Sequence, residues 1–92
     1  MDKARARIIV SGEVQGVGYR SFALAQGRTL RLGGYVRNAF DGTVELEVEG
    51  ERPGIDGLVA LLKQGPRAAR VTGVDVQWKA FSGEFDGFEV RF

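Results

Sequence analysis

Apolar residues recur with two different periods along this chain of 92 residues, and the order of those periods constrains the fold more than any other feature. Alternation of apolar and polar residues is typical of a strand, whereas an apolar repeat every three or four positions is typical of a helix. Strands are predicted over residues 5–11, 35–40, 43–49 and 74–79, with a short fifth strand over 88–92, and helices over 20–32 and 53–64. The predicted order is therefore strand, helix, strand, strand, helix, strand, followed by the short last strand.

This order predicts an α+β fold in a single domain of residues 1–92. It is the order of the ferredoxin-like, split βαβ (β-α-β-β-α-β) arrangement, in which two helices lie on one face of an antiparallel sheet. A right-handed crossover through the first helix makes the first two strands parallel, so their carboxyl ends lie at the same edge of the sheet. We therefore expect the loop after the first strand, the start of the first helix and the end of the second strand to meet at that edge.

The segment that joins the second and third strands carries clear local signals. Asp41-Gly42 suits a tight turn that requires a positive φ angle. The third strand then alternates so that one face carries Val44, Leu46 and Val48 and the other carries Glu45, Glu47 and Glu49. We expect the three glutamates to face solvent and to pair across the sheet with Arg5 and Arg7.

Two residue types are missing from the sequence, and this narrows the possible chemistry. The chain has no Cys, which excludes disulfides, thiolate nucleophiles and Cys-ligated zinc, and no His, which removes the usual general base and the commonest transition-metal ligand. Catalysis would have to use carboxylates, Lys, Arg, amides, hydroxyl groups or backbone N–H groups. Because no apolar stretch has the length of a signal peptide or a membrane span, we expect a cytoplasmic protein with no membrane partner.

The charge of the chain is small but unevenly placed. The formal net charge is +1, yet residues 1–40 hold seven Lys and Arg against two Asp and Glu, whereas residues 41–92 hold six against ten. An anion site would therefore fit the first part of the chain better than the second. The balance is far from the strongly basic surface of most nucleic-acid binders, so we expect no nucleic-acid partner.

Residues 12–20, Gly-Glu-Val-Gln-Gly-Val-Gly-Tyr-Arg, form a glycine-rich loop that leads into the first helix. Glycine lets successive backbone N–H groups converge on an anion, and the helix dipole and Arg20 add positive charge. The loop lacks the Gly-Lys-Ser/Thr ending of a Walker loop, and Ser21 stands where the dinucleotide-binding fingerprint requires glycine. The spacing indicates an anion cradle, and a merely tight connection between strand and helix is the alternative.

The same loop resembles the motif Gly-x-Val-Gln-Gly-Val-x-Phe/Tyr-Arg of the acylphosphatase family. Residues 34–45, Gly-Tyr-Val-Arg-Asn-Ala-Phe-Asp-Gly-Thr-Val-Glu, resemble the second motif of that family. Residues 65–71 and 88–92 also resemble the sequences of that family. The resemblance thus covers nearly the whole chain. Two departures lie in or after the first helix, where Gly27 replaces the usual Ala and Arg31 replaces a frequent Gly.

The resemblance implies an enzyme that hydrolyses small acyl phosphates to a carboxylate and inorganic phosphate without a metal or an organic cofactor. Arg20 resembles the phosphate-binding arginine of the family, and Asn38 resembles the asparagine that orients the attacking water. The residues that resemble the phosphate-binding loop are Gln15, Gly16, Val17, Gly18 and Tyr19. Inorganic phosphate is then expected both as product and as competitive inhibitor, and the protein is expected to act as a monomer.

The alternative function is that of a non-catalytic ferredoxin-like module that binds an anion or a nucleic acid. If the resemblance to the two motifs is set aside, Asn38 can be explained as a turn residue before the hairpin, and Arg20 as an exposed helix residue. By strand alternation Arg37 is expected on the face opposite Asn38, in a surface role. The rings of Tyr19 and Tyr35 are expected to pack against other side chains and not to touch a substrate.

Overall fold

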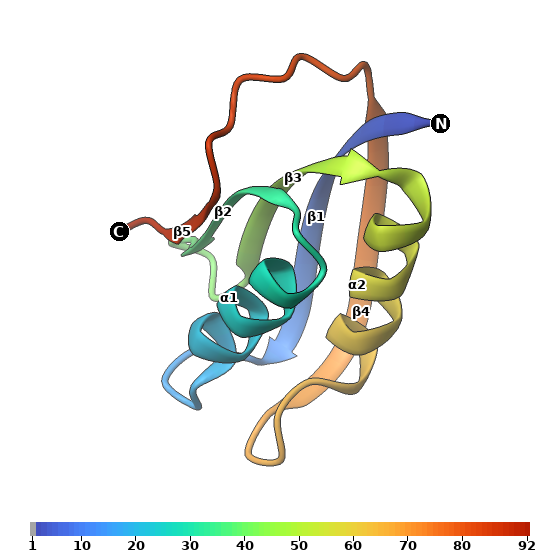
Figure 1. Cartoon of the computed structure of the whole chain (residues 1–92). Coiled ribbons are helices and arrows are strands. Elements are labelled where there is room, and N and C mark those ends of the chain that lie inside the picture. The colour runs from blue at the N-terminus through green and yellow to red at the C-terminus, as the bar shows by residue number, and fades with distance from the viewer. Residues whose placement is uncertain (1) are drawn as a thin grey trace.

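The computed structural model describes residues 2–92 and contains five strands and two helices (Figure 1). The elements are β1 (Lys3–Glu13), α1 (Tyr19–Thr29), β2 (Gly33–Asn38), β3 (Val44–Glu51), α2 (Arg52–Gln64), β4 (Arg70–Lys79) and β5 (Phe88–Val90). The strands form one sheet in the order β4-β1-β3-β2-β5, and both helices lie on the same face of it (Figure 1). The predicted ferredoxin-like fold is confirmed.

The core lies between the two helices and the apolar faces of the central strands. The fully buried side chains of these strands are Ala6, Ile8 and Val10 of β1 and Val44, Leu46 and Val48 of β3. Against them α2 places one helix face, made of Ile55, Leu58 and Leu62. Pro53 lies in the first turn of α2, where its missing N–H breaks no helical hydrogen bond, and Gly65 ends the helix. Within residues 2–92 neither helix is long and apolar enough to cross a bilayer.

The sheet is mixed, whereas an antiparallel sheet was predicted. The other strand pairs are antiparallel, but β5 pairs parallel with β2, with Gly34 opposite Phe88. The cause is residues 80–87, which we call the crossing segment. In Figure 1 this segment runs from the end of β4 to the opposite edge of the sheet, so that β5 enters in the same direction as β2. Because β1 and β2 both run antiparallel to β3, they are parallel to each other, as the right-handed crossover predicts.

β2 lies two residues nearer the N-terminus than its alternation predicts. Gly33 and Gly34 belong to the strand and pair with β3, whereas Ala39 and Phe40 lie in the connection that follows. Gly34 has a φ angle of 142°, and a Cβ atom there would overlap the carbonyl oxygen of Glu47. Only glycine therefore fits this position, and the strand can begin earlier than the side-chain pattern indicates.

α1 ends at Thr29, three residues earlier than predicted. The N–H of Leu32 donates to the carbonyl oxygen of Gly27 over 3.0 Å, which is the long hydrogen bond of a Schellman motif. Arg31 accordingly has a φ angle of 58°, a conformation that glycine usually supplies at this position. Gly27 lets α1 approach β5 closely, since a Cβ atom there would lie 2.9 Å from the ring of Phe88.

The glutamates of β3 do not face solvent, and the prediction for them was wrong. The exposed fractions of Glu45, Glu47 and Glu49 are 5%, 2% and 3%, because basic side chains and the crossing segment cover this face of the sheet. The predicted pairing with the basic residues of β1 is confirmed. Arg5 Nε lies 2.7 Å from Glu47, and Arg7 Nη2 lies 3.0 Å from Glu45.

Glu49 binds the crossing segment directly. Its carboxylate accepts hydrogen bonds from the backbone N–H groups of Ser82 (2.6 Å) and Gly83 (3.1 Å) and from the Ser82 hydroxyl (2.8 Å). Burial acts to raise the pKa of Glu49, but these hydrogen bonds outweigh it, so the pKa lies below its ordinary value. The same balance lowers the pKa of Glu47, to which Arg5 and Lys79 donate. Ionised carboxylates therefore hold the crossing segment and its basic neighbours on the sheet.

Candidate active site

The loop before α1 and the end of β2 lie side by side at one edge of the sheet, as the topology predicts. Gln15 joins them, because its side-chain Nε2 donates to the carbonyl oxygens of Ala39 (2.7 Å) and Thr43 (2.9 Å). These two carbonyl groups flank the turn that follows Asn38, the last residue of β2. One side chain thus fixes the position of the loop relative to Asn38.

Two glycines in the left-handed conformation change the direction of the loop. Gly16 has a φ angle of 74° and Gly18 one of 79°, and a side chain would make either conformation costly even though the space beside both residues is open. Gly18 precedes α1. Phe22 is the first residue whose N–H donates a helical hydrogen bond, and its acceptor is the carbonyl oxygen of Gly18 at 3.1 Å. The N–H groups of the first turn are therefore free of helical partners and side-chain caps, and the turn holds no acidic residue. Such groups attract an anion.

A small hollow of about 80 Å³ opens beside this first turn. The residues that line it are Val14, Gly16, Gly18, Tyr19, Arg20, Ser21 and Asn38. The Oδ1 atom of Asn38 is buried and accepts no hydrogen bond within residues 2–92. A buried amide oxygen without a donor costs about 1–3 kcal/mol, so a donor such as a water molecule fits this point of the hollow.

Arg20 is the charged residue in this lining. Its guanidinium carbon lies 5.1 Å from the centre of the Phe92 ring, and the residue is half-buried. None of the ion pairs among residues 2–92 involves Arg20. The guanidinium can therefore bind an external anion without giving up a carboxylate partner.

The structure brings most of the predicted site residues together. Those that line the hollow are Gly16, Gly18, Tyr19, Arg20 and Asn38. Gln15 and Val17 do not line it, because the amide of Gln15 is bound to the neighbouring turn and Val17 packs against the core. Val14 and Ser21 also line the hollow and were not predicted as site residues. The position of Ser21 in the first helical turn, where N–H groups lack helical partners, was the signal that could have identified it.

Two other side chains behave as their patterns predict. Arg37 lies on the face opposite Asn38, where its Nε is 3.2 Å from Glu45. The hydroxyl of Tyr19 is buried and donates over 2.7 Å to the carbonyl oxygen of Leu62 in α2. Burial raises the pKa of Tyr19, so the phenol stays protonated and contributes packing and no acid–base chemistry.

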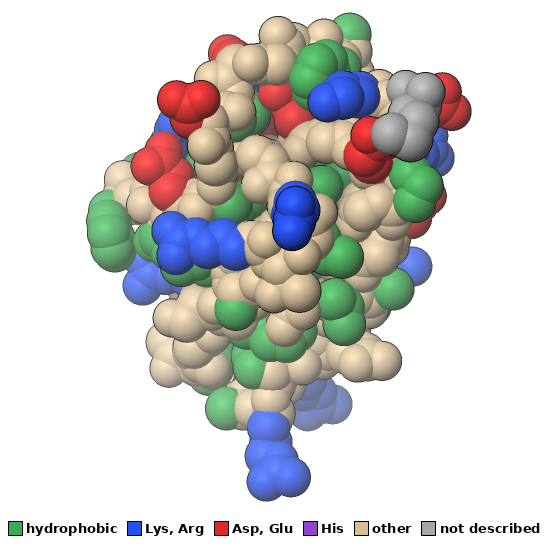
Figure 2. Space-filling view, in the orientation of Figure 1, with side chains coloured by type: hydrophobic (Ala, Val, Ile, Leu, Met, Phe, Trp, Pro, Cys, Tyr) green, Lys and Arg blue, Asp and Glu red, His purple; other side chains and the backbone are tan. Residues whose placement is uncertain are grey.

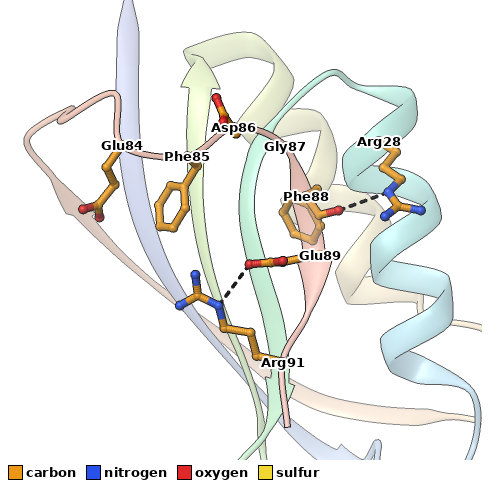
Figure 3. A pocket seen from close by; sticks show the side chains of 8 residues that line it. All are labelled: Arg28, Glu84, Phe85, Asp86, Gly87, Phe88, Glu89 and Arg91. Atoms are coloured by element: carbon orange, nitrogen blue, oxygen red, sulfur yellow. Dashed lines mark hydrogen bonds and ion pairs between the residues drawn. The ribbon is translucent and has the colours of Figure 1, made fainter.

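A larger hollow of about 440 Å³ lies along β5 and does not include the predicted site residues (Figure 3). The charged residues that line it are Arg28, Glu84, Asp86, Glu89 and Arg91. Arg28 already donates to the carbonyl oxygen of Phe88 (3.0 Å), and Arg91 to Glu89 (3.3 Å), as the dashed lines in Figure 3 show. The hollow is lined by three carboxylates and by only two guanidinium groups, and both guanidinium groups already have partners. It therefore repels a phosphate, and the smaller hollow is the candidate site.

Charge is unevenly distributed over the face that carries the helices. In Figure 2 the Asp and Glu side chains gather in the upper part of this face, towards the crossing segment. The lower part, where the loops before α1 and after α2 lie, shows Lys and Arg side chains and no acidic ones. An anionic ligand is therefore attracted to the end of the molecule that carries the candidate site.

The groups around the small hollow define what it can do chemically. N–H groups and a guanidinium can bind the oxygens of a phosphoryl group, and an amide oxygen can accept a hydrogen bond from water. No carboxylate lines the hollow, so no side chain there is a general base. In the described part of the chain, His, Cys, Asp and Glu side chains form no group of three that could hold a metal ion.

Comparison with known proteins identifies the family. The acylphosphatase family model matches residues 6–90. The chain is 53% identical to an acylphosphatase of Anaeromyxobacter dehalogenans over 91 residues, which cover 99% of this chain and 98% of that protein. Its structure is similar to the acylphosphatase from Bacillus subtilis, with a TM-score of 0.93 and 32% identity over 97% of this chain and 99% of that one. It is also similar to an acylphosphatase from Coxiella burnetii, with a TM-score of 0.92 and 34% identity over 98% and 94% of the two chains. The enzyme class inferred from the two motifs is confirmed, and this chain belongs to the acylphosphatase family.

Proposed function

We propose that the protein hydrolyses the carboxyl–phosphate bond of small acyl phosphates, with Arg20 and the glycine-rich loop holding phosphate and Asn38 orienting the water. The observation that carries this proposal is the unpaired, buried Oδ1 of Asn38 in the same hollow as Arg20 and the first turn of α1. A module that only binds phosphate needs hydrogen-bond donors for the phosphate oxygens and no hydrogen-bond acceptor. An acceptor without a partner beside those donors suits a water molecule, which is the second reactant of hydrolysis.

The phosphoryl group is bound by the guanidinium of Arg20 and by backbone N–H groups of residues 15–19. The planar guanidinium can hold two phosphoryl oxygens at once, which a lysine ammonium cannot. Left-handed glycines at 16 and 18 allow neighbouring N–H groups to point into one concavity. Because these donors are fixed before the reaction, they stabilise the charge that spreads over the phosphoryl oxygens in the transition state.

Asn38 holds the attacking water in line with the bond that breaks. Its Oδ1 accepts a hydrogen bond from the water, which leaves a lone pair of the water oxygen directed at phosphorus. The water oxygen bonds to phosphorus while the bond from phosphorus to the acyl oxygen breaks, and the carboxylate leaves with that electron pair. A water proton passes to a phosphoryl oxygen, so the products are a carboxylate and dihydrogen phosphate. No protein base is needed, because the carboxylate is a good leaving group.

The experiment is an assay of benzoyl phosphate hydrolysis with the unaltered protein and two variants. Arg20→Gln should lower kcat/KM by about a hundredfold or more, the effect of removing one preorganised donor, and should weaken competitive inhibition by inorganic phosphate. Asn38→Ala should lower kcat about a hundredfold while the inhibition constant of phosphate changes by less than about twofold. Arg52→Gln and Gln77→Ala, both exposed and outside the hollow, serve as matched controls and should retain full activity.

The outcomes separate this function from its alternative. Full turnover by Asn38→Ala would remove Asn38 from the mechanism. If the unaltered protein hydrolyses no acyl phosphate but binds an oligonucleotide strongly at low salt, the binding module is the correct function. Because the mechanism uses no metal and a single copy of the chain, activity should survive a chelator and should scale linearly with protein concentration.

A further inference from the structure

Two phenylalanine side chains that are exposed to solvent belong to segments next to the candidate site. Phe40 follows Asn38 by two residues, so the Cα atoms of the two lie within about 7 Å of each other, and its side chain is fully exposed. Gln15 anchors the turn that carries it. The ring of Phe92 is almost fully exposed, and its centre lies 5.1 Å from the guanidinium carbon of Arg20. The exposed ring of Phe92 therefore lies beside Arg20, and the exposed ring of Phe40 belongs to the turn that follows Asn38.

Phe40 differs from the other exposed aromatic side chains of the protein. The guanidinium carbon of Arg52 lies 3.7 Å from the centre of the Trp78 ring, and the Lys3 ammonium lies 5.6 Å from that of Phe81. Within residues 2–92 the ring of Phe40 has neither a cation nor a second ring against it. Its ring surface is thus free to contact a ligand.

The small hollow has no room for the acyl part of a bulky substrate. Its volume is about 80 Å³, whereas a cavity that binds benzene measures roughly 150 Å³. When the phosphoryl group and the attacking water lie in the hollow, the acyl group must lie outside it, at the mouth. The exposed rings of Phe92, beside Arg20, and of Phe40, on the turn after Asn38, can offer apolar surface to it.

We propose that Phe40, together with Phe92, forms an apolar subsite for the acyl group and makes the protein prefer acyl phosphates with an aromatic or bulky apolar acyl group. This inference rests on the proposed function. Contact between the acyl group and the rings removes apolar surface from water, and two aromatic rings gain further from offset or edge-to-face packing. A methyl group, as in acetyl phosphate, is too small to reach both the rings and the hollow, so it gains little.

The test compares kcat/KM for benzoyl phosphate and acetyl phosphate in the unaltered protein and in Phe40→Ala. Loss of the ring should lower kcat/KM for benzoyl phosphate roughly two- to tenfold and leave that for acetyl phosphate unchanged. Phe40→Tyr, which keeps the ring, should retain the preference. Phe81→Ala removes an exposed ring from the crossing segment and should change neither value. Phe92 is left intact because its ring contacts Arg20.

The possible outcomes separate the subsite from the activity. An unchanged ratio of the two kcat/KM values in Phe40→Ala, or an equal fall for both substrates, would overturn the subsite. If that result comes with hydrolysis that Arg20→Gln abolishes, the proposed function stands without the subsite. If the unaltered protein hydrolyses neither substrate, the function and the subsite are both refuted. Because Phe40 is fully exposed, a thermal melt of Phe40→Ala should match that of the unaltered protein.

Discussion

Replacement of Glu49 by Gln tests whether a buried carboxylate holds the crossing segment on the sheet. In the structure Oε2 accepts the N–H and the hydroxyl of Ser82, and Oε1 accepts the N–H of Gly83. A glutamine has one oxygen in place of two. If that oxygen remains with Ser82, the new NH₂ group faces the N–H of Gly83, and this N–H keeps only its longer contact, 3.2 Å, to the remaining oxygen.

The magnitude follows from these contacts. Because Gly83 is exposed, solvent can replace the acceptor that its N–H loses, so the weakening of this hydrogen bond costs about 1 kcal/mol. The hydrogen bonds from Ser82 survive but lose the charge of their acceptor, which removes about half of their strength and adds about 1 kcal/mol. The free energy of unfolding of Glu49→Gln should therefore be about 2 kcal/mol lower than that of the unaltered protein.

The assay is urea unfolding at pH 7 and at about pH 3, monitored by circular dichroism. The pKa of Glu49 in the folded protein lies below its ordinary value of 4.5. A carboxylate of this kind stabilises the fold fully above the pKa of the unfolded chain, and the stabilisation is lost as the pH falls through the lower, folded pKa. The difference between the two proteins should be complete at pH 7 and should shrink in acid.

Glu51→Gln is the matched control, since Glu51 lies on the same face of the same strand but accepts no side-chain hydrogen bond from the described residues. It should change the free energy of unfolding by less than about 0.5 kcal/mol. If Glu49→Gln costs no more than this control, or if its cost is the same at both pH values, the carboxylate of Glu49 does not hold the crossing segment.

Three further predictions concern the backbone and the rate. Arg31→Gly should raise the free energy of unfolding by about 0.5–1 kcal/mol in urea melts. The free energy gained by relieving the left-handed φ angle of a non-glycine residue exceeds the cost of the greater freedom that glycine gives the unfolded chain. A lower free energy of unfolding would show that contacts of the arginine side chain outweigh this gain. Gly34→Ala should lower the melting temperature by more than about 10 °C, because its Cβ atom would overlap the carbonyl oxygen of Glu47. The rate of acyl phosphate hydrolysis should be nearly flat from about pH 5 to 7, since the chain has no His, and a bell-shaped profile with an imidazole-like limb would contradict this.

The elements of the fold were predictable wherever one side of an element is apolar. Val44, Leu46 and Val48 face the core as their alternation predicts, because the apolar side of a strand packs against the helices. The burial of the glutamates on the other side was not predictable. It depends on the path of the crossing segment, which has no periodic pattern and is positioned by single contacts such as that between Glu49 and Ser82.

For the candidate site, sequence and topology predicted the location but not the atomic detail. Parallel β1 and β2 bring their carboxyl ends to one edge, so Asn38 and the loop before α1 had to be neighbours. The unpaired Oδ1 of Asn38 and the two hydrogen bonds of Gln15 depend on the backbone angles of Gly16 and Gly18. A glycine in a sequence signals conformational freedom without indicating which conformation is adopted.

The position of β1 inside the sheet, between β3 and β4, bears on how fast the chain can fold. Val10 of this strand pairs with Val44 on one side and with Val74 on the other, so neither edge of β1 can be completed by a neighbour in sequence. Pairings over such separations require long loops to close first, and domains dominated by them fold in milliseconds to seconds rather than in microseconds. Until β3 and β4 arrive, β1 exposes an apolar strand with two open edges, which makes the unfinished chain prone to self-association. Refolding yields should therefore fall as protein concentration rises, even though the completed sheet encloses β1 on both sides.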